Sequence, residues 1–199
     1  AGRCRFAFEL LPPLKGDDIT TLFATVDRLK RFDPAYINVT YHREDVKYVE
    51  RPDGLLERRI ASKRPGTVAI SAAIQARYGI EVVPHLICGG FSAYDTEDAL
   101  IDLNFMGINN VLALRGDTLR GEHSFRPTQG GHSHADELVS QIVAMNQGRM
   151  LDAEVDSVHP TDFCIGVAGY PEKHAEAPNA VCDIERLKRK VDTGADYIV

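Results

Sequence analysis

The sequence predicts an α/β protein with a parallel sheet, in the form of the first six units of a (β/α)8 TIM-type barrel. Stretches with strand character alternate with stretches of helical periodicity along the chain, and no Asn-Gly or similar turn joins consecutive strands. Such alternation gives right-handed βαβ units. Five strands also leave polar residues at their C-terminal ends, and in a barrel all these ends converge on one functional face. Six units cannot close an eight-stranded cylinder, so we expect residues 1–199 to form a single, incomplete barrel domain.

The first strand is expected over residues 6–11, where five of six residues are apolar. This composition favours a strand covered on both faces. Glu9 stands near its end, before Pro12 and Pro13 stop any ladder. A carboxylate beside an apolar run is costly to bury alone. Glu9 is therefore either solvated or paired at the strand mouth, or a catalytic acid.

The later elements follow from the same periodicities. Helices are expected over 19–31, 67–78, 94–105, 135–146 and 179–193, and strands over 36–40, 81–88, 110–114, 163–168 and from 197 onward. Asp17-Asp18 and Asp95-Thr96 are candidate N-caps. In the polar segment 41–65, Leu55, Leu56 and Ile60 indicate a short helix after a turn at 52–54. The long loop 118–134 is expected to be functional or mobile.

Composition excludes several functional classes. The net charge of -6 and the pI near 5.6 argue against a nucleic-acid-binding protein, although a local basic pocket for a phosphorylated cofactor stays possible. No apolar run approaches the ~20 residues that cross a bilayer, so we expect no membrane association. The four cysteines are scattered without a C-x-x-C pair, which favours reduced thiols in a cytoplasmic protein over a zinc site. Both ends of the chain look trimmed, and a homo-oligomer is left open.

Other candidate residues each have an ordinary structural interpretation. His85 could be a hydrogen-bonded core histidine, and residues 115–117 a plain turn with an internal ion pair. The cations at 186–190 could only favour a helix C-terminus, or else meet a cofactor's diphosphate as charge-assisted donors. His132 and His134 are spaced like a metal pair, but no matching cysteines accompany them. We interpret both as solvated and expect no metal.

Six motifs occur in the order found in one known family. They are Phe-Glu-Leu-Leu-Pro-Pro, Asn-Val-Thr-Tyr, Pro-His-Leu-Ile-Cys, Ala-Leu-Arg-Gly-Asp, Gly-Val-Ala-Gly-Tyr-Pro-Glu-Lys-His and Leu-Lys-Arg-Lys-Val-Asp-Thr-Gly-Ala-Asp. Together they resemble 5,10-methylenetetrahydrofolate reductase over residues 6–199. Any one of these motifs alone is a weak signal, whereas six in register are a strong one.

The resemblance implies a barrel that holds FAD, takes electrons from NADH or NADPH, and reduces a folate substrate in one-carbon and methionine metabolism. It assigns Glu9 as the general acid that assists opening of the methylene bridge of the folate. That step needs a proton donor that is still protonated near neutral pH. It places Asp117 beside the flavin and the pterin, where an anion tunes the flavin potential. It implies that the remaining matched positions contact FAD or lie beside it: Thr40, Tyr41, His85, Arg115, Gly116, Ala168, Tyr170, His174, Asp183, Arg189 and Lys190.

The chain also departs from the family pattern. His42 stands where the family usually has Gly, and a charged insertion follows to Pro65. The loop after Asp117 is extended, Arg186 replaces a residue that is often neutral, and strands seven and eight are absent. No ribose-reading motif distinguishes NADH from NADPH. Two alternatives therefore stay open: a folate-binding barrel methyltransferase without flavin, and a non-catalytic barrel fragment.

Overall fold

The computed structural model describes residues 5–43, 45–62, 64–119, 122, 124–155 and 158–199. One six-stranded sheet is parallel throughout, in the order β1-β2-β5-β6-β7-β8, and a separate antiparallel pair is formed by β3 and β4. The elements are β1 (Ala7–Leu10), α1 (Ile19–Leu29), the 3-10 turn η1 (Lys30–Phe32), β2 (Tyr36–Val39), β3 (Asp45–Glu50), β4 (Leu56–Ser62), α2 (Thr67–Tyr78), β5 (Val82–Ile87), α3 (Ala93–Phe105), β6 (Asn110–Leu114), α4 (Ala135–Asn146), β7 (Cys164–Val167), α5 (Ala180–Thr193) and β8 (Tyr197–Ile198).

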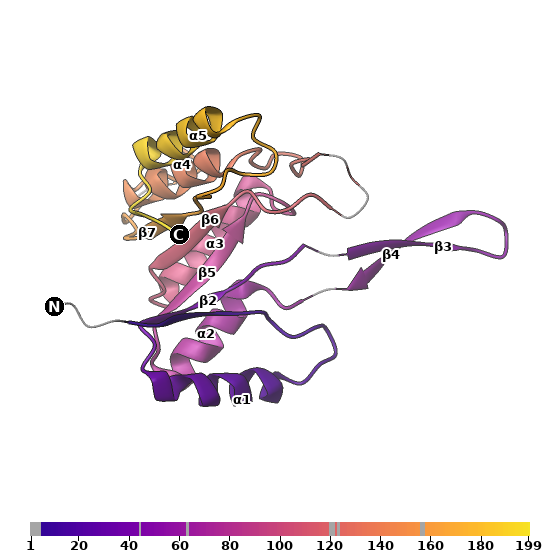
Figure 1. The fold of residues 1–199 in the computed structure, drawn as a ribbon, viewed down its shortest axis with the longest axis horizontal. Helices are drawn as coiled ribbons and strands as arrows, with labels where there is room; N and C mark the ends of the chain where they lie inside the picture. The colour runs from indigo at the N-terminus through magenta and orange to yellow at the C-terminus, as the bar shows by residue number, and fades with distance from the viewer. Residues whose placement is uncertain (1–4, 44, 63, 120–121, 123, 156–157) are drawn as a thin grey trace.

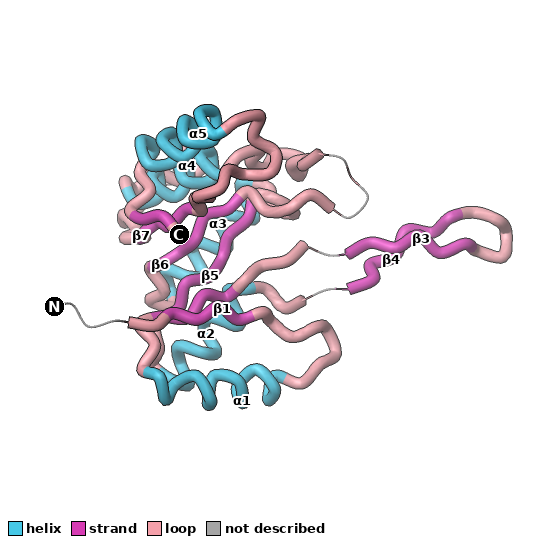
Figure 2. Tube along the Cα trace, in the orientation of Figure 1, coloured by secondary structure: helices cyan, strands magenta, loops and turns pink. Residues whose placement is uncertain are grey.

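The main sheet is an open part of a (β/α)8 barrel. Its strands neighbour one another in chain order without a reversal, whereas a doubly wound sheet would reverse at a switch point. Figures 1 and 2 show the sheet curling, with the helices outside it. The predicted fold class and all five predicted helices are confirmed, within one or two residues at their ends.

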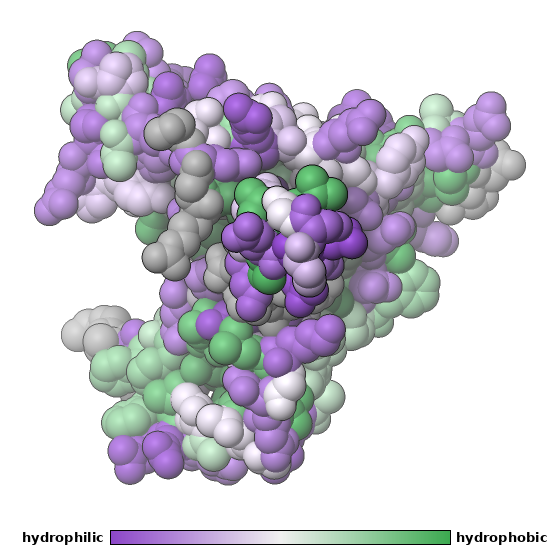
Figure 3. Space-filling view, turned by 90° about the vertical axis from the view of Figure 1, so that its right-hand side faces the viewer, coloured by the Kyte–Doolittle hydropathy of each residue, from purple (hydrophilic) through white to green (hydrophobic). Residues whose placement is uncertain are grey.

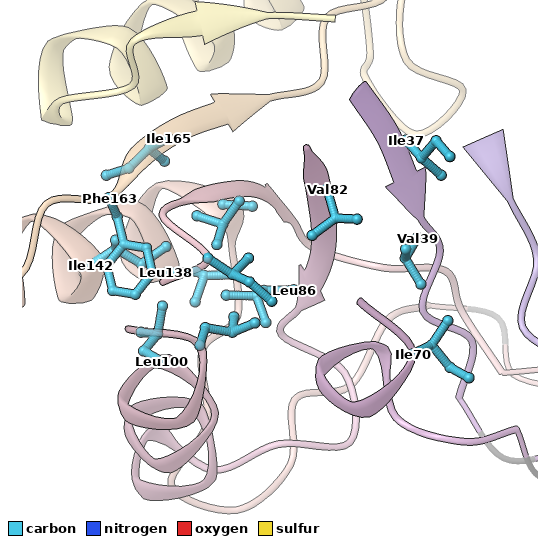
Figure 4. Packing of buried hydrophobic residues seen from close by; sticks show 14 of the residues in the cluster. Ile37, Val39, Ile70, Val82, Leu86, Leu100, Leu138, Ile142, Phe163 and Ile165 are labelled. Carbon is cyan, nitrogen blue, oxygen red and sulfur yellow. The ribbon is translucent and has the colours of Figure 1, made fainter. Parts of the chain in front are cut away.

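The core lies between the sheet and the helices. On α4, Leu138, Ile142 and Met145 recur at helical spacing and are fully buried. Leu100 of α3 and Ile165 of β7 pack into the same cluster (Figure 4). Full burial of such a side chain contributes about 1.5–3 kcal/mol. This packing fixes the strands from which the functional loops emerge.

The expectation that both faces of the first strand are covered is wrong. Along β1, only Leu10 is buried, and the flanking Phe6 and Leu11 are half exposed at 52% and 50%. The reason is topological, since β1 is an edge strand that pairs only with β2 in the described sheet. Local composition cannot report which strand lies at the edge.

The helix expected near residues 55–60 is also wrong, and so is the expected absence of a hairpin. Residues 45–62 form an antiparallel hairpin, β3 and β4, which we call the arm. It projects from the body on the side where the strands of the main sheet end (Figures 1 and 2). Its turn is closed by hydrogen bonds from the Arg51 N–H to the Leu55 carbonyl and from the Gly54 N–H to the Arg51 carbonyl. The Pro-Asp-Gly signal at 52–54 was a hairpin turn.

Helix caps follow the local chemistry of the sequence. Asp18 caps α1 by accepting a hydrogen bond from the Thr20 N–H, as predicted. For α3, the expected caps Asp95 and Thr96 are wrong, because Ser92 is the N-cap. Asp95 instead completes a capping box by accepting from the Ser92 N–H. No helix in the described part of the chain is long and apolar enough to cross a bilayer.

Candidate active site

A cavity of about 640 Å³ opens where the strands of the main sheet end. Residues at or just beyond the C-terminal ends of β1, β2, β5, β6 and β7 all contribute to its wall. Figure 3 looks onto this side of the molecule, with the arm toward the viewer and hydrophilic residues around it. In barrels, this face is where the strand ends place functional side chains.

The structure brings all thirteen residues predicted for the site to this one cavity. They come from six separate segments of the chain, so their convergence is a property of the fold. The lining includes Glu9, Thr40, Tyr41, His85, Arg115, Gly116, Asp117, Ala168, Tyr170, His174, Asp183, Arg189 and Lys190.

The two predicted catalytic carboxylates reach the cavity from different strands. Glu9 belongs to β1, and Asp117 follows β6; both are exposed. Neither carboxylate forms a hydrogen bond or ion pair with another described residue. Both are therefore available to a molecule bound in the cavity. Beside Glu9, Thr40 is buried and donates its hydroxyl to the Leu10 carbonyl at 3.3 Å, and the Tyr41 ring lies edge-on to Phe91 at 5.1 Å.

His85 is buried on β5 without being satisfied. It is only 5% exposed, and its Nε2 atom finds no hydrogen-bond partner among the described residues. Burial, helped by the nearby His42, lowers the pKa of His85 to about 4. The imidazole is thus neutral at pH 7. The interpretation of His85 as a hydrogen-bonded core histidine is not supported, because its Nε2 lacks a partner and the residue lines the cavity.

The turn after β6 is held by contacts that the sequence did not reveal. Arg115 forms a bidentate ion pair with Glu176, at 2.6 and 2.8 Å, and lies over the Phe125 ring at 5.0 Å. The alternative of a plain turn with an ion pair to Asp117 is therefore wrong. Gly116 has φ +86, and a Cβ there would lie 3.2 Å from Ile87 side-chain atoms. The positive φ and the tight contact both favour glycine at this position.

The segment between β7 and α5 is folded back on itself. Tyr170 and His174 pack edge to face at 4.9 Å, and the His174 N–H donates to Asp183 at 2.9 Å. Lys173 has a positive φ of 90, which is strained for a non-glycine residue. Its ammonium group donates to the carbonyls of His174 and Ala177, and these bonds hold the strained turn in place.

The cations of α5 divide between the cavity and the outer surface. Lys190 is half-buried, donates to the Ala168 carbonyl, and has a pKa lowered by burial. Arg189 lies 3.8 Å from Asp136 and is mostly exposed. Lys188 instead pairs with Asp192 outside the cavity lining. The cluster is therefore more than a helix C-terminal charge, since Arg186, Arg189 and Lys190 all line the cavity.

The cavity wall is basic although the chain is acidic. Six Lys or Arg side chains line it against four Asp or Glu side chains. Arg43 and Arg64, at the two ends of the arm, were missed by the sequence analysis, as was Asp136 on α4. The sequence signal for both arginines was their position on either side of the insertion. Arg43 comes just after the end of β2, and Arg64 comes just before α2.

The interpretation of both loop histidines as solvated holds only for one. His134 is exposed, lines the cavity and lies 3.5 Å from Glu137. His132 is half-buried and shares a 2.5 Å hydrogen bond with the Gln141 side chain. Within the described residues, no group of three or more potential ligands could hold a metal ion.

Comparison with known proteins gives the family. The model of the family described as methylenetetrahydrofolate reductase matches residues 1–199. The chain belongs to the methylenetetrahydrofolate reductase family. The six sequence motifs therefore pointed to the correct family.

Named relatives are similar over the whole of this chain. It is 32% identical to 5,10-methylenetetrahydrofolate reductase of Pectobacterium carotovorum and 31% identical to that of Escherichia coli, covering 54% of each. It is 31% identical to methylenetetrahydrofolate reductase (NADH) 1 of Arabidopsis thaliana, covering 30% of that protein. The chain thus spans about half the length of its bacterial relatives in the reductase family.

Similar solved structures support the fold alone. A mandelate oxidase structure matches with a TM-score of 0.54 at 14% identity, covering 96% of this chain and 49% of that one. A 2,3-dimethylmalate lyase matches with a TM-score of 0.51 at 10% identity, covering 98% and 57%. This reductase-family chain thus shares about half of each of those larger folds.

Proposed function

We propose that this chain forms part of a flavin-dependent enzyme that reduces 5,10-methylenetetrahydrofolate to 5-methyltetrahydrofolate with NADH or NADPH. The observation that carries the proposal is the convergence of Glu9, His85, Asp117 and Lys190 on one cavity. These residues come from four elements far apart in the chain, and each matches a family motif. We place the reaction in cytoplasmic one-carbon and methionine metabolism, in keeping with the free state of Cys88, Cys164 and Cys182.

The cavity fits FAD on the chemistry of its donors. Arg189 and Lys190 supply charge for a diphosphate, and the unpaired His85 Nε2 offers a neutral polar contact. When bound, FAD supplies hydride-transfer chemistry. Lys190 already holds the Ala168 carbonyl, which positions its ammonium group at the cavity wall. The residues that would hold the cofactor are Thr40, Tyr41, His85, Arg115, Gly116, Asp117, Ala168, Tyr170, His174, Asp183, Arg189 and Lys190.

Glu9 is the proposed proton donor to the one-carbon bridge of the folate. Its carboxyl group is exposed in the free protein, so bound substrate must exclude water from it before it can act efficiently. Asp117 stands after β6, across the sheet from β1. We assign it to contact with the pterin and to the tuning of the flavin.

The test is made on the full-length protein. The purified wild type should show the visible absorption of bound flavin, and Glu9→Gln should keep its reduction by NAD(P)H while folate reduction falls by 10²-fold or more, on the order of a general acid's contribution. Equal loss of both half-reactions would refute the role of Glu9. A colourless protein that binds folate would favour the methyltransferase alternative, and a protein that binds neither would favour a non-catalytic domain.

A further inference from the structure

Two cations line the cavity far along the sheet from the α5 cluster. Arg43 follows β2, and Arg64 precedes α2, so they stand at the two ends of the arm. In the sheet, β1 and β2 lie at one edge, and β7 and β8, which flank α5, lie at the other. Figures 1 and 2 show the arm leaving the body from the β1–β2 side. The cavity therefore has two separate sets of cations: Arg43 and Arg64 toward one edge of the sheet, and the α5 cations toward the other.

Arg43 lies against the glycines that end β5. A Cβ on Gly89 would come within 2.6 Å of Arg43 Cδ and 3.2 Å of its Nη1, so only a glycine leaves room for this side chain. Arg43 Nη1 is buried and has no hydrogen-bond partner in the described part of the chain. A buried, unpaired guanidinium nitrogen is unfavourable unless an acceptor reaches it. Arg43 as a residue lines the cavity, so an acceptor bound there can pair with its guanidinium after a shift of the side chain.

Arg64 is tied to the wall that carries Glu9. Its Nη1 donates to the Pro12 carbonyl, two residues beyond the end of β1. A guanidinium has five N–H donors in a planar fork, and no other hydrogen bond joins Arg64 to the described residues. Neither Arg43 nor Arg64 forms an ion pair with a described acidic residue. Both cations thus line the cavity without an acidic partner, and Arg64 is also held by its hydrogen bond to the Pro12 carbonyl.

We propose that Arg43 and Arg64 form an oxyanion subsite, for a carboxylate or a phosphate of the substrate that shares the cavity with the flavin. The proposal rests on the proposed function for the identity of that substrate. Guanidinium groups match both anions through paired hydrogen bonds. A folate offers glutamate carboxylates, and a nicotinamide dinucleotide offers phosphates. The subsite is separate from Arg189 and Lys190, which we assign to the cofactor.

The experiment measures equilibrium dissociation constants in the full-length protein, without turnover. The probes are NADH, NADPH and tetrahydrofolate monoglutamate, with FAD as the reference ligand. The variants are Arg43→Met and Arg64→Met, with Arg43→Lys as a milder change that keeps the charge and loses the fork. The matched control is Arg59→Met, because Arg59 lies on the arm, pairs with Glu57 at 2.8 Å, and does not line the cavity.

Both methionine variants should raise the dissociation constant of the same probe by about 10- to 100-fold, with a smaller rise for Arg43→Lys. The dissociation constant of FAD in the Arg43 and Arg64 variants should stay within about twofold of the wild-type value. So should the dissociation constants of all three probes in Arg59→Met, because a twofold change is too small to represent a lost charged hydrogen bond. A loss of affinity confined to the folate identifies a carboxylate as the anion bound by the subsite. A loss of affinity confined to a dinucleotide identifies a phosphate.

Unchanged affinity for all three probes would overturn the subsite, and so would an equal loss in the Arg59→Met control or a parallel loss of FAD. A wild type without flavin would count against the proposed function alone. The same three probes would still decide the subsite in that protein, because binding is measured without turnover.

Discussion

Burial of His85 predicts a specific dependence of stability on pH. The ordinary pKa of 6.5 applies to the unfolded chain, and the folded protein lowers it to about 4. Between these values, the unfolded state binds a proton that the folded state does not bind. The free energy of unfolding therefore falls as pH decreases from 6.5 to 4. Below pH 4, His85 is protonated in both states and causes no further decrease.

The interval between the two pKa values corresponds to a change of at most about 3 kcal/mol in the free energy of unfolding. Other groups also titrate in this range, so the quantity to measure is the difference between wild type and His85→Asn. Urea denaturation at several pH values gives this difference directly. The variant will differ in overall stability, but its profile should lack the His85 contribution. The free energy of unfolding of wild type minus that of the variant should therefore decrease by up to about 3 kcal/mol as pH falls from 6.5 to 4.

The reasoning would be refuted if the two profiles stayed parallel between pH 6.5 and 4. It would also be refuted if the His85 ring resonances titrated near pH 6.5 by NMR. Either result would mean that the imidazole is solvated or that Nε2 has a partner. A ligand that accepts or donates at Nε2 should shift this titration, which makes His85 a reporter of cavity occupancy.

Three further perturbations test the site and its scaffold. Asp117→Asn should raise the flavin reduction potential and weaken folate binding, because an anion disfavours negative charge on the reduced ring; a potentiometric titration with no change would contradict this. Gly131→Ala should cost about 1–3 kcal/mol by chemical denaturation, because its Cβ would lie 2.2 Å from the Phe91 carbonyl oxygen. Gly66→Ala, in open space but at the N-cap of α2, should lower the free energy of unfolding by at most about 1 kcal/mol, and equal costs for the two variants would refute the steric argument. Glu176→Gln should cost at most about 1 kcal/mol, because Glu176 is 45% exposed, yet it should speed flavin loss by freeing Arg115; an unchanged dissociation rate would argue against that link.

The parallel βα alternation was available from the sequence because strand and helix periodicities are local. Apolar spacing on residues 135–146 predicted α4, and Pro-His-Leu-Ile-Cys predicted β5, since each pattern depends only on neighbouring residues. The candidate site was predictable for a related reason. In a barrel, residues at strand ends share one face, so the sequence alone assigns Glu9, His85 and Asp117 to one site. Family motifs named the remaining lining residues, and the structure placed them together.

Tertiary structure alone decided the features that depend on distant partners. The edge position of β1 follows from strand order, so its exposure could not be read from the apolar run at 6–11. The arm at 45–62 needed two strands to find each other across a turn, and weak helical spacing at 55–60 concealed it. The pairing of Arg115 with Glu176 and the unpaired state of His85 and Arg43 are likewise outcomes of three-dimensional packing. Local sequence fixes which groups can donate, accept or carry charge, whereas only the folded chain determines which of them are left without a partner.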